Sequence, residues 1–319
     1  MNFCAVLKLI YKNIYYMNAK EIVAKNRGLE SGHRGCAGCG IPILIKQVLS
    51  AVDNVVVATG TGCLEIITTP FPFTSWPVPW IHNAFENTAA TVSGVETAYK
   101  VLKKKGKISK EIKFLGIAGD GGSYDIGLQS LSGMLERGHN CVFLCYDNEA
   151  YQNTGNQRSS ATPLGAGTTT TPVGKIKQGK EEYRKDLAKI AIAHNIPYVA
   201  QTSIHDYSDL TEKVKKAFKN TPAVIVALEP CPTNWKFDSS LTIEVAKKAT
   251  ETCFWPLYEY ENGKYKINYK PAKKLPVEEF LKLQGRFKHL FKPENRKIIE
   301  KIQENVDKNW EELLKLEKL

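Results

Sequence analysis

Two polar turns, each following a short apolar run, constrain the fold of this chain more than any other feature. The first turn, residues 119–122 (Gly-Asp-Gly-Gly), follows the apolar run 113–118, and the second begins at Asn148, after the run 141–146. Asp120 and Asn148 lie 28 residues apart, the length of one strand–helix–strand crossover. Because the strands of such a unit are parallel, we expect both turns at the carboxyl edge of one sheet, where open α/β sheets bind ligands.

The chemistry of these turns suits a divalent cation and a phosphate group. The Asp120 carboxylate, the Asn148 amide oxygen and an irregular backbone carbonyl are oxygen ligands of the kind that Mg²⁺ prefers. The backbone N–H groups of Gly121 and Gly122, at the start of a helix, suit phosphate oxygens. A lone Gly-Asp-Gly is also typical of a tight turn in which Asp120 caps the next helix. The asparagine-rich turn at the matching distance favours the ligand site.

Apolar runs alternate with helix-like segments along most of the chain, which indicates an α/β fold with a doubly wound, mostly parallel sheet. The further expected strands are residues 54–58, 197–200 and 223–228. The expected helices are residues 42–52, 83–103, 182–194 and 207–219. Prolines between residues 66 and 80 predict an irregular segment there.

The pattern changes beyond about residue 254. A hairpin is expected around Asn262-Gly263, followed by helices over residues 276–291 and 294–319. Apolar side chains recur every fourth residue in the last helix, and this stripe packs either on its own domain or against another subunit. We therefore expect three parts. They are an N-terminal extension and helix (1–30), an α/β domain (31–253) and a C-terminal arm consisting of the hairpin and helices (254–319).

Composition narrows the class of protein. An apolar content of 43% over 319 residues supports a sizeable core, yet no apolar run reaches the ~20 residues of a membrane helix. The net charge of +11 is spread among glutamates and no nucleic-acid motif occurs, so a solvated basic surface is expected, which would also suit an acidic protein partner. The first 16 residues lack a signal-peptide cleavage site. We expect a cytoplasmic protein that binds neither membranes nor nucleic acid, with its eight cysteines outside a disulfide framework.

Four of the cysteines occupy turns. Cys36 and Cys39 form a Cys-x-x-Cys pair, a pattern of thioredoxin-like redox pairs, zinc sites and iron–sulfur sites. No strand is expected before the pair, which disfavours a redox pair, and no second close pair exists, which disfavours a zinc ribbon. Cys63 and Cys231 each follow an expected strand, so they fall on the same sheet edge as the polar turns. Four thiolates from such positions can hold a 4Fe–4S cluster.

The remaining cysteines carry no ligand pattern. Cys141 and Cys145 share one face of an expected strand, so we expect them to pack in the core. Cys4 and Cys253 are assigned no role.

Further motifs accompany the turns between residues 32 and 234. They are Gly-His-Arg at 32–34, Thr-Gly-Cys-Leu-Glu at 61–65, His-Asn-Ala-Phe-Glu-Asn at 82–87, Tyr-Asp-Asn-Glu-Ala-Tyr at 146–151, Asn-Thr-Gly at 153–155, Arg-Ser-Ser-Ala-Thr-Pro at 158–163 and Thr-Thr-Thr-Thr-Pro at 168–172. With these motifs the chain resembles the β subunits of pyruvate:ferredoxin oxidoreductases (pyruvate synthases), which have a thiamine diphosphate-binding fold of the diphosphate-binding type. Such enzymes convert pyruvate and coenzyme A to acetyl-CoA and CO₂, pass two electrons to ferredoxin, and can run in reverse.

The resemblance implies three cofactors: thiamine diphosphate, Mg²⁺ and one 4Fe–4S cluster. The implied Mg²⁺ ligands are Asp120, Asn148 and the carbonyl of Ala150. The residues implied to lie against the diphosphate are Gly119, Gly121 and Thr154. Asn153 is implied to sit beside the thiazolium ring, as the catalytic residue. The implied cluster ligands are Cys36, Cys39, Cys63 and Cys231, of which Cys63 also adjoins the cofactor.

The chain lacks a second α/β unit to supply the glutamate that thiamine enzymes place on the aminopyrimidine, and it lacks a two-cluster ferredoxin pattern. We therefore expect an enzyme subunit that is active only in a hetero-oligomer. The resemblance implies a pyrimidine- and substrate-binding alpha subunit, ferredoxin-like gamma and delta subunits, and ferredoxin as the electron acceptor. Two alternatives remain, a β subunit of a branched-chain 2-oxoacid (2-oxoisovalerate):ferredoxin oxidoreductase and a non-catalytic iron–sulfur electron-transfer protein. Thiamine binding separates the second alternative from the others.

Overall fold

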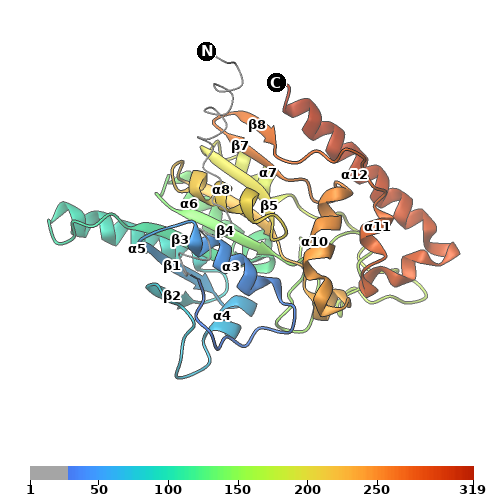
Figure 1. The fold of residues 1–319 in the computed structure, drawn as a ribbon, viewed down its shortest axis with the longest axis horizontal. Helices are drawn as coiled ribbons and strands as arrows, with labels where there is room; N and C mark the ends of the chain where they lie inside the picture. The colour runs from blue at the N-terminus through green and yellow to red at the C-terminus, as the bar shows by residue number, and fades with distance from the viewer. Residues whose placement is uncertain (1–27) are drawn as a thin grey trace, which may run out of the picture.

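An eight-stranded sheet forms the centre of the computed structural model, which describes residues 28–319; the expected N-terminal helix and Cys4 lie outside the described residues. The strand order is β2-β1-β3-β4-β6-β5-β7-β8. The strands are β1 (Val55–Gly60), β2 (Trp80–Asn83), β3 (Lys113–Gly119), β4 (Val142–Asp147), β5 (Tyr198–Ser203), β6 (Ala223–Leu228), β7 (Tyr258–Glu261) and β8 (Lys264–Ile267). All pairings from β2 to β5 are parallel, and the β7–β8 hairpin adds the two antiparallel pairings, so the doubly wound, mostly parallel sheet is confirmed (Figure 1).

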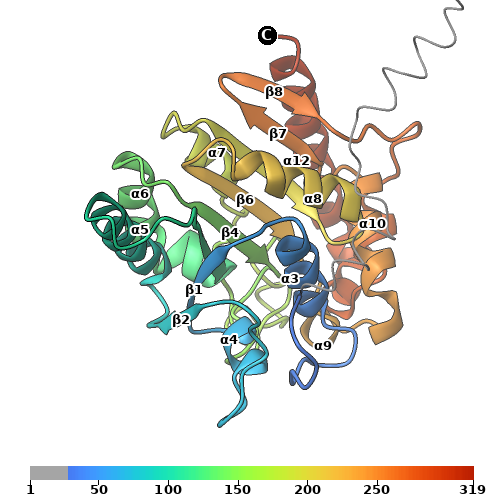
Figure 2. The same cartoon turned by 60° about the vertical axis from the view of Figure 1, so that its left-hand side comes forward.

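The central strands send alternate side chains into two separate hydrophobic cores. Leu115 and Ile117 of β3 face one core, and Phe114 and Ala118 face the other. The first core lies under α3 (Gly40–Ser50), α4 (Cys63–Thr68) and α8 (Tyr207–Ala217). The second lies under α5 (Thr88–Lys104), α6 (Leu128–Glu136), α7 (Leu187–Ile192) and α12 (Arg296–Leu316). Period-two alternation with apolar residues on both faces is what a parallel sheet covered on both sides requires (Figure 2).

Cys141 and Cys145 lie in the second core and are both 0% exposed, which confirms the expectation that they pack there. No helix among residues 28–319 is both long enough and apolar enough to span a membrane.

Several expected elements differ from those observed. The segment 66–80, expected to be irregular, overlaps the end of α4 and the start of the edge strand β2. The predicted helix at 83–103 begins only at Thr88, because β2 pairs with β1 through Asn83. The predicted helix at 182–194 is shorter, since Asp186 caps α7 by accepting from the backbone N–H of Lys189. Two helices after β6, α9 (Pro232–Trp235) and α10 (Thr242–Glu251), had no counterpart in the expectations.

The predicted helix at 276–291 is broken into α11 (Glu278–Leu281) and the 3₁₀ helix η3 (Gly285–Phe291). Gln284 between them is extended, and the backbone N–H of Gly285 donates to the Lys236 carbonyl at 3.0 Å. A Cβ atom at Gly285 would lie 2.7 Å from the Lys236 Cβ. A tertiary contact therefore interrupts the helix at a position where local periodicity alone favoured continuation.

The C-terminal arm packs on its own chain. The β7–β8 hairpin turns at Asn262 and Gly263, both with positive φ, and β7 extends the sheet next to β5. The α12 side chains of Ile302 and Val306 are 4% and 6% exposed and lie in the second core. Of the two alternatives for this apolar stripe, the structure therefore shows packing against the α/β domain (Figure 1).

Candidate functional site at the carboxyl edge of the sheet

The strand order places the carboxyl ends of β1, β3, β4 and β6 next to one another, so the turns that follow them meet at one edge. A cavity of about 200 Å³ lies among the segments that follow β1, β2, β3 and β4. The predicted residues that line it are Cys63, Gly119, Asp120, Gly121, Asn148, Ala150, Asn153 and Thr154. Gly122 is buried just behind it, where its Cα faces the Phe85 carbonyl, and does not line the cavity. The cavity thus gathers both polar turns that the sequence singled out.

Asp120 is a buried carboxylate, 1% exposed, at the end of β3. Burial, and then the negative charge of Asp147, raise the pKa of Asp120 well above its usual range, while a hydrogen bond donated by the Ser159 hydroxyl opposes this shift. Among the described residues, no lysine or arginine forms an ion pair with Asp120. A divalent cation in the cavity would supply the positive charge that the protein does not.

The side-chain amide of Asn148 has a defined orientation. Its Nδ2 donates to Glu229 Oε2 at 3.1 Å, which leaves the oxygen of the same amide for a metal. Its backbone carbonyl accepts hydrogen bonds from Gln152 Nε2 at 2.7 Å and from the indole N–H of Trp235 at 2.8 Å. Gln152 Oε1, on the cavity wall, is buried and has no hydrogen-bond partner within the described part of the chain. Oxygen donors at this turn therefore fit a hard cation.

Buried charged side chains hold the turn that contains Asn148. Glu149 adopts a φ of +64°, and its carboxylate accepts from Arg184 Nη1 at 2.7 Å and from Arg286 Nη2 at 2.5 Å. Arg184 also pairs with Asp147 at 2.5 Å. The Arg286 guanidinium stacks over the Trp235 ring, 3.6 Å from its centroid. Because paired buried charges hold the residues on both sides of Asn148, the backbone of the turn is held in one conformation.

Tyr151 lines the cavity, and its ring explains why residue 121 is a glycine. A Cβ atom at Gly121 would lie 2.2 Å from Tyr151 Cε1, so no larger residue fits there. The Tyr151 hydroxyl donates to Asp125 at 3.0 Å, and its ring packs against Phe85 with centroids 5.8 Å apart. The aromatic pair keeps the ring close to the backbone N–H groups of the Gly-Asp-Gly-Gly turn.

The four turn cysteines are free thiols, and three of them precede or begin helices: Cys39 before α3, Cys63 at the start of α4, and Cys231 before α9. Burial, together with the charges of Glu229 and of Cys36, raises the pKa of Cys63 and of Cys231 to about 12. Burial likewise raises the pKa of Cys39, with Cys231 and Cys63 adding to it. The four thiols therefore lie within electrostatic reach of one another.

Within residues 28–319 no three cysteine, histidine, aspartate or glutamate side chains are already placed as a set of metal ligands. The loop before α3 is nevertheless shaped for close packing. Gly38, with φ +72°, lies against the Ser239 carbonyl, which a Cβ atom would approach to 2.2 Å. Four free thiols within electrostatic reach of one another are of the ligand type that the iron atoms of an iron–sulfur cluster take from a protein.

Asn153 connects the two predicted sites. The Asn153 amide is near enough to the Cys63 thiol to lower its pKa, against the larger effect of burial. Thr154 is exposed, and its hydroxyl donates to Gln157 Oε1 at 2.5 Å. The predicted thiazolium neighbour and a predicted cluster ligand thus line the same cavity.

Sequence reasoning missed Glu229, Phe85, Tyr151 and Gln152 as parts of the site. For Glu229 a signal was present, because it is the first residue after the apolar run 223–228, in the same relation to β6 as Asp120 has to β3. Arg184 and Arg286 had no such signal, since they lie 35 and 137 residues from Glu149 along the chain.

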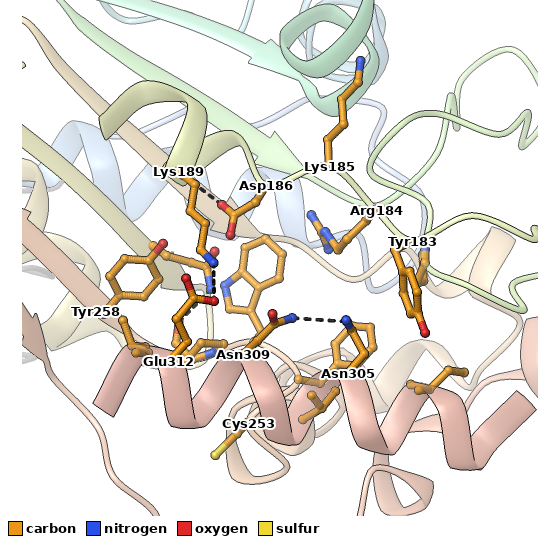
Figure 3. A pocket seen from close by; sticks show the side chains of 18 of the residues that line it. Tyr183, Arg184, Lys185, Asp186, Lys189, Cys253, Tyr258, Asn305, Asn309 and Glu312 are labelled. Atoms are coloured by element: carbon orange, nitrogen blue, oxygen red, sulfur yellow. Dashed lines mark hydrogen bonds and ion pairs between the residues drawn. The ribbon is translucent and has the colours of Figure 1, made fainter. Parts of the chain in front are cut away.

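A second cavity, of about 260 Å³, lies between α12 and the segment that leads into α7. In Figure 3, Lys189 and Glu312 reach across it and form an ion pair at 2.8 Å. None of the predicted site residues lines this cavity. The carboxyl-edge cavity is therefore the candidate site.

Comparison with known proteins places the site in a family. Residues 60–227 match the model of the thiamine pyrophosphate enzyme C-terminal TPP-binding domain. The pyruvate synthase subunit PorB of Thermotoga maritima is 50% identical over 309 residues, covering 94% of this chain and 95% of the relative. PorB of Methanocaldococcus jannaschii is 51% identical over 280 residues, covering 86% and 93% of the two chains. The ketoisovalerate oxidoreductase subunit VorB of Pyrococcus abyssi is 47% identical over 290 residues, covering 90% and 92%.

The fold is also similar to a solved structure, 2-oxoglutarate:ferredoxin oxidoreductase from Magnetococcus marinus with 2-oxoglutarate, coenzyme A and succinyl-CoA bound. The TM-score is 0.55 at 19% identity, over 73% of this chain and 82% of that one. The matched residues run from the last residue of β1 into β6 and include all the residues that line the cavity. The chain belongs to the PorB β subunits of pyruvate synthase, within the 2-oxoacid:ferredoxin oxidoreductases, and carries their thiamine pyrophosphate-binding domain.

Proposed function

We propose that this chain is the β subunit of a cytoplasmic pyruvate:ferredoxin oxidoreductase that binds thiamine diphosphate, Mg²⁺ and one 4Fe–4S cluster. The observation that carries the proposal is the single cavity in which Asp120, Asn148, Ala150, Asn153 and Cys63 meet. When bound, thiamine diphosphate supplies the electron sink for the decarboxylation of a 2-oxoacid. Cluster-bearing thiols beside that cofactor would place an electron acceptor where the electrons are released.

The roles of the chain's own residues follow from their chemistry. Asp120, the oxygen of the Asn148 amide and the Ala150 carbonyl would hold Mg²⁺. The turn formed by Gly119, Gly121 and Gly122, with Thr154, would hold the diphosphate through backbone N–H groups and a hydroxyl. Asn153 would orient the substrate beside the thiazolium ring. Cys36, Cys39, Cys63 and Cys231 would hold the cluster.

The proposed assembly contains an alpha subunit that binds the pyrimidine and the substrate, with gamma and delta subunits that pass electrons to ferredoxin. The aromatic side chains of Phe85 and Tyr151 cover one side of the cavity. Tyr151 and the lining residues around it belong to the long connection from β4 to α7, and the alpha subunit would close the rest. Exclusion of water protects a reactive carbanion from protonation, which is why an open edge requires a partner.

The experiment is anaerobic purification of the native complex, with assays of thiamine diphosphate, iron and coenzyme A-dependent reduction of ferredoxin. Pyruvate and 2-oxoisovalerate are compared as substrates. A β subunit specific for 2-oxoisovalerate is the second candidate function, favoured by the 47% identity to VorB. A larger kcat/KM for 2-oxoisovalerate would select it, and a complex that holds iron without thiamine diphosphate would refute both candidates.

A further inference from the structure

The carboxylate of Glu229 contacts two segments of the proposed site. One is the turn that begins at Asn148, called here the metal turn, and the other is the loop that carries Cys36 and Cys39. Its Oε2 accepts from Asn148 Nδ2 at 3.1 Å, and its Oε1 accepts from the backbone N–H of Gly40 at 2.8 Å. The same Oε1 lies 4.0 Å from the Cys39 sulfur. The residue is 1% exposed. One buried carboxylate therefore connects segments that are 81 and 189 residues away along the chain.

The contact with Asn148 decides which atom of the amide faces the cavity. Both oxygens of the Glu229 carboxylate accept hydrogen bonds, Oε1 from the backbone N–H of Gly40 and Oε2 from Asn148 Nδ2, so the NH₂ group of Asn148 faces Glu229. The amide oxygen then points away from Glu229. Since a metal ion binds the oxygen and not the nitrogen of an amide, Glu229 selects the orientation that ligation requires.

The contact with Gly40 fixes the loop before α3. This 11-residue helix has no side-chain cap of its own at Cys39, and Glu229 accepts from its first N–H group. Negative charge is favourable at a helix N-terminus. A Cβ atom at Gly40 would lie 2.9 Å from Glu229 Oε1, so the backbone approaches this carboxylate as closely as only glycine allows.

The backbone of Glu229 is fixed as well. Its N–H donates to the Asp147 carbonyl at 2.8 Å, which joins the carboxyl ends of β6 and β4. The carboxylate therefore stands on the same pair of strands that carries Asn148 and Cys231, and its position does not depend on a mobile loop.

We propose that Glu229 is a positioning residue that orients the Asn148 amide toward Mg²⁺ and ties the Cys36–Cys39 loop to the metal turn. The proposal rests on the proposed function, because it assumes that Mg²⁺ and the cluster occupy these sites. Its effect is to hold the diphosphate site and the cluster ligands in one fixed arrangement.

The test is Glu229→Gln in the co-expressed complex. Glutamine offers one acceptor and one donor, and the backbone N–H of Gly40 cannot change direction, so the glutamine oxygen stays on Gly40. Asn148 must then turn its oxygen toward the glutamine NH₂ and away from the metal. We expect the affinity for thiamine diphosphate in the presence of Mg²⁺ to fall about 10–100-fold, with the iron content retained. Calorimetric titration and iron analysis measure both quantities.

The exchange variant Asn148→Asp with Glu229→Gln separates positioning from mere stability. It keeps the total charge and the hydrogen bond, with donor and acceptor reversed, and leaves one oxygen of the introduced carboxylate for the metal. We expect it to regain most of the affinity lost in Glu229→Gln. Glu96→Gln is the matched control, since Glu96 is also 1% exposed but pairs with His139 and Lys100 away from the cavity.

Wild-type affinity in Glu229→Gln, or an exchange variant that binds no better than Glu229→Gln, would overturn the inference. If Glu229→Gln does not assemble, the exchange variant decides: near wild-type affinity supports the inference, and weak binding refutes it. A wild-type complex that does not bind thiamine diphosphate would instead refute the proposed function, and the inference with it.

Discussion

The residue that most limits what the site can do is Asp120, a buried carboxylate that forms no ion pair with a lysine or arginine of residues 28–319. A buried carboxylate is stable as an anion only near compensating charge, and the groups that hydrogen-bond to Asp120 are a serine hydroxyl and the backbone. Sequence reasoning found Asp120 and Asn148 because glycine turns after apolar strands are local signals. It could not find Arg184 or Arg286, whose contacts with Glu149 exist only in the folded chain.

Asp120→Asn should release thiamine diphosphate while the iron content stays at the wild-type level. The amide keeps the size of the side chain but removes the negative charge that attracts Mg²⁺. Bound thiamine and iron in the purified complex are the quantities to measure. Asp206→Asn is the control, because Asp206 caps α8 and asparagine caps as well. Full thiamine occupancy in Asp120→Asn would show that Asp120 is not the metal ligand.

Serine substitutions should divide the cysteines into two groups. Cys36→Ser, Cys39→Ser, Cys63→Ser and Cys231→Ser should each degrade one 4Fe–4S cluster, because a serine hydroxyl is a poor substitute for a thiolate. Cys145→Ser should leave the cluster intact and cost stability, since it buries a hydroxyl in an apolar core. Electron paramagnetic resonance and iron analysis distinguish the groups. Equal iron loss from Cys145→Ser would contradict the assignment.

At the scale of elements, the site depends on adjacent strand ends and on supports that come from the C-terminal arm. The strands were predictable because their apolar runs are bounded by glycine and proline turns. The edge strand β2 was not, since its residues are mostly exposed and show no alternation. The break between α11 and η3 was not predictable either, because it depends on the Gly285 contact with Lys236.

The substitution Arg286→Leu tests whether η3 stabilises the turn that contains Glu149. Removing Arg286 takes away one of the two guanidinium groups on Glu149 and leaves its buried carboxylate incompletely paired. Loss of one partner of a buried pair typically costs about 3–5 kcal/mol, so we expect a loss of that size in the free energy of unfolding and weaker thiamine diphosphate binding. Chemical denaturation and calorimetric titration measure the two effects.

Arg296→Ala is the control for Arg286→Leu. Arg296 forms an exposed ion pair with Glu278, and such pairs contribute about 0–1 kcal/mol. Similar losses from the two substitutions would mean that the buried layer does not stabilise the turn.

At the scale of the whole molecule, the hairpin and α12 belong to the same packed unit as the α/β domain. The hairpin adds two strands to the sheet, and α12 shares the second core. The cavity nevertheless remains at an edge of this unit, and the described residues that line it include no glutamate to activate the aminopyrimidine. On the proposed function, this cavity would be one part of an active site that a partner subunit completes.

The isolated chain, even with its cluster rebuilt, should reduce ferredoxin or viologen with pyruvate at no detectable rate. On the proposed function, the activating glutamate and the group that holds the substrate carboxylate would come from another subunit. Co-expression with the pyrimidine-binding subunit should restore activity that depends on coenzyme A. Anaerobic viologen reduction measures the rate. Robust pyruvate-dependent reduction by the isolated chain would mean that the missing glutamate lies within these 319 residues.

The order of the strands implies that a cluster on the four turn cysteines would also stabilise the fold. Cys63 follows β1 and Cys231 follows β6, so the two cysteines follow strands on opposite sides of β3 and β4, the pair that carries Asp120 and Asn148. A cluster on these thiols would cross-link the two flanks of the sheet edge and close loops of more than a hundred residues, which restricts the chain as a disulfide does. Oxidative loss of iron would then do more than interrupt electron transfer. It would also remove a cross-link between the segments that surround the cofactor site.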